Sequence, residues 1–111
     1  MTILRKNEPR LRIERKMLIK ITGYLKFKAL IGNQSLFELE SNSTLGDALI
    51  LLSRRRGKKF EEMIFDPQSR EIKRSNLILL NGQSYLNILT RLDTELKEGD
   101  EIVLLPAMAG G

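Results

Sequence analysis

The feature that most constrains the fold is one long amphipathic helix placed between segments of strand character. Thr44 is suited to cap its amino terminus, and Asp47 occupies the acidic position of a capping box. The apolar side chains of this helix recur at i, i+3, i+4 and i+7, as Leu45, Ala48, Leu49 and Leu52. Gly57 predicts its end. One such helix covers a single face of a sheet, which favours a layered fold of the α+β class.

The remaining apolar residues fall mainly in short segments typical of strands. We expect strands over residues 17–24, 35–40, 76–80, 83–85 and 101–105, with an earlier start of the first strand as the alternative. Turns are predicted at Gly32–Asn33 and Asn81–Gly82, and Gly99 suits a turn that requires a positive φ. Helical spacing returns briefly over residues 60–64 before Pro67 breaks it, and residues 86–92 form an irregular or helical link. This element order predicts an α+β roll.

Two of these strands are apolar at consecutive positions rather than at alternate ones, namely Leu77–Leu80 and Ile102–Leu105. Both of their faces are therefore apolar, although only one long helix is available to cover them. We expect the uncovered face to present an apolar patch of the kind that partners bind. The candidate docking residues are Leu77, Leu79, Leu96, Val103 and Leu105. The alternative is that residues 1–16, the segment around Phe60 or a second copy of the chain covers this face.

The sequence closes with small residues after a proline. Pro106 has no N–H and biases Leu105 toward extended geometry, so we expect regular strand pairing to stop near Leu105. The residues behind it would form a narrow, flexible thread that reaches about 20 Å when extended: Pro106, Ala107, Met108, Ala109, Gly110 and Gly111. The carboxylate of Gly111 is then the candidate reacting group. The alternative is an ordinary frayed terminus.

Composition excludes several kinds of chemistry. The chain contains no Cys and no His, which removes thiol nucleophiles, imidazole bases and zinc-finger ligands. The acidic side chains between Asp93 and Glu101 are expected to be solvated, and Gly57–Lys58 lacks the other residues of a phosphate-binding loop. We therefore expect no catalytic residue, no metal ligand and no bound cofactor. No apolar run approaches the length of a membrane helix, so a cytoplasmic protein is expected.

The net charge of +5 is unevenly distributed. Residues 1–16 carry six basic and two acidic side chains, a net charge of +4, whereas the other 95 residues have a net charge of +1. We therefore divide the chain into a basic arm (1–16), a folded domain (17–105) and a reactive tail (106–111). Met17 could also be a natural start site, which the intact mass of the native protein would test.

A nucleic-acid-binding module built on the basic arm and on Arg54–Arg56 is an alternative. Cations at the end of a helix also suit its dipole, and the sequence shows no interleaving of basic and aromatic residues for base stacking. Direct binding of nucleic acid is therefore the less favoured reading. Such binding would weaken steeply with salt and would be lost when residues 1–16 are removed.

The residues from Leu92 to Gly111 resemble the closing motif of the ubiquitin-like β-grasp family, on its branch of sulfur carriers and small archaeal modifiers. This branch includes the small subunit of molybdopterin synthase. The resemblance extends more loosely over the Thr44 helix and Leu80–Gly82, and so covers about residues 17 to 111. It implies a β-grasp roll in which a mixed sheet packs on one main helix and ends in a diglycine tail.

The resemblance also implies a carrier rather than an enzyme. An activating enzyme would use ATP to adenylate the Gly111 carboxylate, and sulfur transfer would convert it to a thiocarboxylate. The sulfur would pass to a molybdopterin precursor, through the large subunit of molybdopterin synthase, or to tRNA, through a tRNA-thiolation enzyme. Alternatively, the activated carboxyl would be joined to a lysine of a target protein, as in a protein modifier.

Two residues depart from the family's usual ending, and a third bears on the choice between carrier and modifier. Ala107 stands where a second proline is common, and Met108 stands where valine is frequent. Neither change blocks access to the terminus. Ala109 replaces the arginine that precedes the diglycine of ubiquitin itself, which favours the sulfur-carrier type.

Overall fold

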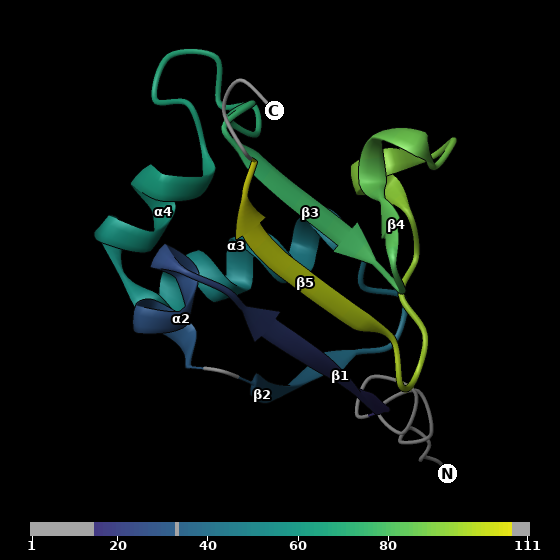
Figure 1. Ribbon diagram of the computed structural model, residues 1–111. Helices are drawn as coiled ribbons and strands as arrows, with labels where there is room; N and C mark the ends of the chain where they lie inside the picture. The colour runs from purple at the N-terminus through teal and green to yellow at the C-terminus, as the bar shows by residue number, and fades with distance from the viewer. Residues whose placement is uncertain (1–14, 33, 108–111) are drawn as a thin grey trace, which may run out of the picture.

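A computed structural model describes residues 15–32 and 34–107. Its centre is a five-stranded mixed sheet in the order β2-β1-β5-β3-β4. The strands are β1 (Lys16–Gly23), β2 (Gln34–Glu40), β3 (Asn76–Leu80), β4 (Gln83–Ser84) and β5 (Glu101–Pro106). Only β1 and β5 run parallel; the other neighbouring strands are antiparallel. The last strand therefore lies in the middle of the sheet, between β1 and β3 (Figure 1).

The helices lie mainly on one face of the sheet. They are α2 (Lys26–Ile31), α3 (Leu45–Arg56) and α4 (Lys58–Ile64), with two short 3₁₀ helices, η1 (Tyr85–Asn87) and η2 (Arg91–Asp93). Figure 1 shows α3 behind β5 and β3. Within the described ranges, no helix has the length and hydrophobicity that crossing a membrane requires.

The capping box predicted for α3 is present. The Thr44 hydroxyl accepts a hydrogen bond from the Asp47 N–H at 3.1 Å, and the Asp47 carboxylate accepts one from the Thr44 N–H at 3.0 Å. A cap of this kind stabilises a helix by about 1 kcal/mol. Gly57, with a φ of 97°, ends the helix as expected. α4 begins at the next residue and includes residues 60–64, where helical spacing was expected.

The hydrophobic core lies between the sheet and the helices. Leu45, Leu49 and Leu52 of α3 are fully buried against the inner face of the sheet. Phe27 of α2 and Phe60 of α4 meet edge to face, with ring centroids 6.1 Å apart. Such aromatic pairs contribute about 0.5–1.5 kcal/mol beyond their buried area. The three helices therefore share one core.

The connection between the first two strands differs from the prediction. β1 and β2 pair antiparallel, with Met17 opposite Leu39, as the predicted hairpin requires. However, α2 forms most of the link, and no helix was predicted there. Its apolar residues, Phe27, Leu30 and Ile31, do follow helical spacing, but a single short turn gives little signal.

The turns at Asn81–Gly82 and at Gly99 were predicted correctly, whereas Asn33 of the predicted Gly32–Asn33 turn lies outside the described residues. Asn81 and Gly82 both have positive φ, 52° and 87°, as a type I′ turn requires, and they join β3 to β4. Gly99 has a φ of 86° before β5. β4 is one residue shorter than expected because Tyr85 begins η1.

The predicted boundary between the arm and the domain lies one or two residues too late. Lys16 belongs to β1 and pairs with Glu40, and the Arg15 carbonyl accepts a hydrogen bond from the Ser41 N–H at 3.3 Å. These two residues extend the sheet. The rest of the predicted arm, residues 1–14, lies outside the described residues.

Candidate functional site

The central position of β5 determines where the carboxyl-terminal segment leaves the domain. Ile102 and Leu104 of β5 are fully buried toward the helices. β5 is hydrogen-bonded to β1 on one side and to β3 on the other, so it is held along both edges. The residues that follow β5 therefore start from a fixed position at the end of a central strand.

Strand pairing continues beyond Leu105, contrary to our prediction. Pro106 is part of β5 and lies opposite Asn76. The Ala107 N–H donates a 2.7 Å hydrogen bond to the Ser75 carbonyl. The bond toward β3 is thus made by Ala107, and the missing N–H of Pro106 leaves this ladder intact. The two residues assigned to the start of the tail, Pro106 and Ala107, are attached to the sheet.

The side-chain amide of Asn76 connects the end of β5 with the helices. Asn76, at the start of β3, donates from its Nδ2 to the Met63 carbonyl at 2.6 Å. This bond ties β3 to the end of α4. Because Asn76 lies opposite Pro106, the same residue connects the helical layer with the point at which β5 ends.

Four of the predicted docking residues lie together on the open face of the sheet. Leu105 is opposite Leu77, and Val103 is opposite Leu79, so the four side chains form one cross-strand group. All four are half-buried. In Figure 1 this face is turned toward the viewer, and none of the described helices lies in front of it. The apolar surface predicted from the two consecutive apolar runs is therefore present on the described structure.

Leu96 does not belong to this surface. Its side chain is only 3% exposed and forms part of the hydrophobic core. The Leu96 N–H donates to the Ser43 carbonyl at 2.9 Å, and the Leu45 N–H donates to the Thr94 carbonyl at 2.9 Å. These bonds hold the segment before β5 against the start of α3. Leu96 is consequently a packing residue and is unavailable to a partner.

The remaining predicted site residues, Met108, Ala109, Gly110 and Gly111, lie outside the described residues. Sequence reasoning also overlooked two residues beside the exit. Tyr24 and Leu25 follow β1, and both side chains are exposed. The Tyr24 N–H donates to the Leu104 carbonyl at 3.0 Å, so these two residues lie beside the end of β5.

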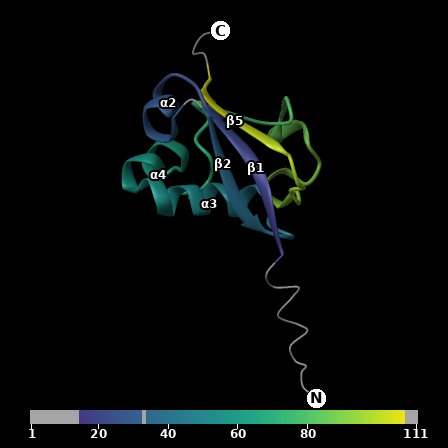
Figure 2. The ribbon, with the colours of Figure 1, turned by 90° about the horizontal axis from the view of Figure 1, so that it is seen from below.

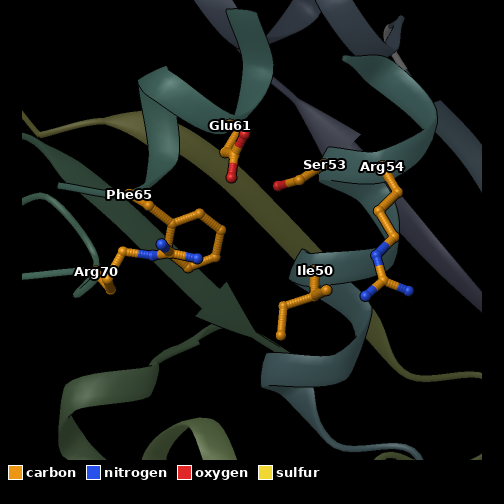
Figure 3. Close-up of a pocket in the computed structure, with 6 residues that line it drawn as sticks. All are labelled: Ile50, Ser53, Arg54, Glu61, Phe65 and Arg70. Atoms are coloured by element: carbon orange, nitrogen blue, oxygen red, sulfur yellow. The ribbon is translucent and has the colours of Figure 1, made fainter. Parts of the chain in front are cut away.

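A separate hollow of about 440 Å³ lies between α3 and α4 (Figure 3). It is lined by Ile50, Ser53, Arg54, Glu61, Phe65 and Arg70. Its one hydroxyl, that of Ser53, donates to the Leu49 carbonyl at 3.0 Å. Among residues 15–32 and 34–107, no group of three or more His, Cys, Asp or Glu side chains could hold a metal ion. The exit of β5 therefore remains the best candidate for function.

The architecture defines the class of protein. Similar folds occur in the small archaeal modifier protein 1 of Methanosarcina acetivorans (TM-score 0.69, 22% identity, 87% of this chain and 99% of that one) and in a Haloferax volcanii protein, HVO 2177 (TM-score 0.70, 22% identity, 86% and 88%). A putative molybdopterin converting factor, subunit 1, from Pyrococcus furiosus also matches (TM-score 0.65, 23% identity, 83% and 99%). The fold is the ubiquitin-like β-grasp, as expected.

The model of the ThiS family matches residues 24–111, which is most of the chain. The chain therefore belongs to the ThiS family of ubiquitin-like proteins. No curated protein sequence matches it.

Proposed function

We propose that this chain is a sulfur carrier whose Gly111 carboxylate is activated by a partner enzyme. A carboxylate oxygen attacks the α-phosphorus of ATP, and pyrophosphate leaves, which gives an acyl adenylate. A hydrosulfide equivalent then attacks the carbonyl carbon, and AMP leaves, which gives a thiocarboxylate. The observation that supports this most directly is the central, doubly paired β5, which leads into a diglycine end.

The geometry of β5 limits how far the reacting group can extend. Ala107 is still bonded to Ser75, so four residues, 108–111, follow the last anchored position. At about 3.3 Å per residue, they span at most roughly 13 Å. This is shorter than the 20 Å expected from a tail that starts at Pro106. An activating enzyme must therefore approach closely to the edge of the sheet where β5 ends.

The open face supplies the surface for such an approach. Leu77 and Leu79 of β3 lie opposite Leu105 and Val103 of β5, and all four side chains are half-buried. An apolar surface next to the reacting segment allows a partner to bind the body and the tail together. We assign the docking of the activating enzyme to this face, with the bases and nucleotide site on the enzyme, because the chain has no His and no Cys.

The sulfur acceptor follows from the relatives by analogy. The Pyrococcus furiosus protein is described as a putative molybdopterin converting factor subunit. We therefore propose a molybdopterin precursor, bound by the large subunit of molybdopterin synthase, as the first acceptor to test, and a tRNA-thiolation enzyme as the second. We propose a cytoplasmic location for the carrier.

Intact-mass spectrometry tests the carrier function. The chain is incubated with the activating enzyme from the same genome, ATP and sulfide. We expect the mass change that corresponds to replacement of one oxygen by sulfur, located on the peptide that contains Gly111. A variant that lacks Gly110 and Gly111 is the control and should not change. An unchanged wild-type mass, with an enzyme that activates another carrier, would exclude the proposal.

A covalent modifier is the second candidate, favoured by the structural similarity to the small archaeal modifier protein 1. In this case the activated Gly111 carbonyl forms an isopeptide bond with a target lysine. Digests of cells that express the wild-type chain would then contain lysines that carry the carboxyl-terminal remnant of the chain. The variant without the two final glycines should give none. The carrier and the modifier share the activation step, so both outcomes can be observed for one chain.

A further inference from the structure

The backbone of Leu25 has a conformation that leucine rarely adopts. Its φ is 56° and its ψ is −124°, and the Phe27 N–H closes the turn by donating to the Tyr24 carbonyl at 3.1 Å. These angles match the first central position of a type II′ turn, where glycine is strongly preferred. A leucine at this position is strained, since its Cβ crowds the backbone.

The packing of α2 explains the conformation of this backbone. Phe27 and Ile31 of α2 are buried in the core. At Gly23, an added Cβ would lie only 2.8 Å from the Ile31 side chain and 2.9 Å from the Phe27 carbonyl carbon. The helix is thus pressed directly onto the end of β1, and the chain must turn sharply between Gly23 and Phe27.

The packing does not explain the leucine side chain. Leu25 is 65% exposed, so its side chain contributes little to the core. Glycine would adopt the same backbone conformation without strain. The chain therefore carries an unfavourable residue whose apolar side chain is turned to solvent. A residue that costs stability and is not used in packing is a candidate for contact with another molecule.

Its position indicates which molecule that would be. β1 and β5 are parallel, so they end at the same edge of the sheet, and the Tyr24 N–H is bonded to the Leu104 carbonyl at 3.0 Å. Figure 2 shows α2 beside the end of β5. Tyr24, 46% exposed, and Leu25 form an exposed apolar pair at this edge. The pair therefore lies beside the point at which β5 ends.

We propose that Tyr24 and Leu25 form an exit anchor, a docking site for an apolar pocket on the enzyme that adenylates Gly111. This inference rests on the proposed carrier function and adds a partner contact outside the open face. The exit anchor holds the edge of the sheet while the short carboxyl-terminal segment enters the active site. Its role is to position the carrier, and it does not take part in the chemistry.

The substitution Leu25→Gly separates stability from recognition. The variant should unfold at a higher temperature than the wild type, because strain is removed. Its KM as a substrate in ATP–pyrophosphate exchange should rise about tenfold, with little change in kcat, because a buried apolar contact at an interface is lost. Tyr24→Ser, which retains the backbone N–H, should also raise the KM.

The matched control is Leu89→Gly. Leu89 is 98% exposed and lies between η1 and η2, beyond the edge strand β4, so this variant also loses an exposed leucine. Its KM should equal that of the wild type. A wild-type KM for Leu25→Gly would overturn the exit anchor while leaving the carrier function in place. A wild-type chain that is not adenylated at all would overturn both proposals.

Discussion

The Ala107 N–H donates a 2.7 Å hydrogen bond to the Ser75 carbonyl, one residue beyond the proline that closes β5. This bond carries the pairing of β5 with β3 one residue beyond Pro106. A proline near the end of a strand is easily taken as the point of release. Here the proline occupies a position at which its missing N–H is not used toward β3.

Hydrogen exchange at Ala107 measures this boundary. Because the Ala107 amide is bonded to Ser75, we expect it to exchange at least about tenfold more slowly than in an unstructured peptide of the same sequence. Nuclear magnetic resonance of the wild-type chain gives the rate for this single amide. Exchange at the rate of the unstructured peptide would return the boundary to Leu105 and restore the longer reach.

The substitution Gly23→Ala tests the close contact between β1 and α2. The new methyl group would lie 2.8 Å from the Ile31 side chain, so the helix must shift. Overpacking of this kind lowers the free energy of unfolding by about 1–3 kcal/mol. Urea denaturation gives the difference from the wild type.

Ile31→Ala supplies the control for that experiment. Combined with Gly23→Ala, it removes the side-chain half of the clash and leaves the contact with the Phe27 backbone, at 2.9 Å. The double variant should therefore be more stable than the sum of the two single effects predicts. Strict additivity would show that the Ile31 side chain does not press on Gly23.

The fold could be predicted from the sequence wherever the signal was local. The capping box at Thr44 and the glycine at Gly57 define α3 within a few neighbouring residues, and Asn81–Gly82 defines a turn by its conformational preference alone. The central place of β5 is different. It depends on pairing with β1, about 80 residues earlier in the chain, and it was available only through the resemblance to a known family.

The error at Leu96 has a simple physical cause. Apolar composition shows that a residue avoids water, but it does not show whether the domain or a partner covers it. Leu96 was therefore assigned to the surface, although two backbone hydrogen bonds hold its segment against α3. The conformation of Leu25 was missed for a different reason, because the sequence does not reveal its positive φ.

The substitution Leu77→Lys tests the open face as the docking surface. Leu77 is half-buried opposite Leu105, and a lysine there can extend to solvent while placing a charge in the apolar group. We expect the affinity for the activating enzyme to fall about tenfold or more. Isothermal titration calorimetry with the purified enzyme measures it.

Leu36→Lys is the matched control on the same sheet. Leu36 is 68% exposed on the edge strand β2, and β1 separates β2 from β5. Binding of this variant should remain within about twofold of the wild type. Equal losses for Leu36→Lys and Leu77→Lys would point to a general effect of added charge and would remove the assignment of the docking surface.

The loop after α4 should give the chain a specific acid sensitivity. The Asp66 carboxylate accepts backbone hydrogen bonds from Ser69 at 3.0 Å and from Gln68 at 2.8 Å, and these bonds lower its pKa from the ordinary value of 3.8. Because the folded pKa lies below the unfolded one, the stabilisation is complete above about pH 4 and is lost as the pH falls through the folded pKa.

A titration followed by nuclear magnetic resonance should therefore give a midpoint below 3.8 for Asp66. In Asp66→Asn the amide oxygen can still accept both bonds but does not titrate, so this part of the acid dependence of unfolding should disappear. A midpoint at or above the ordinary value would show that the two backbone bonds do not hold the carboxylate in solution.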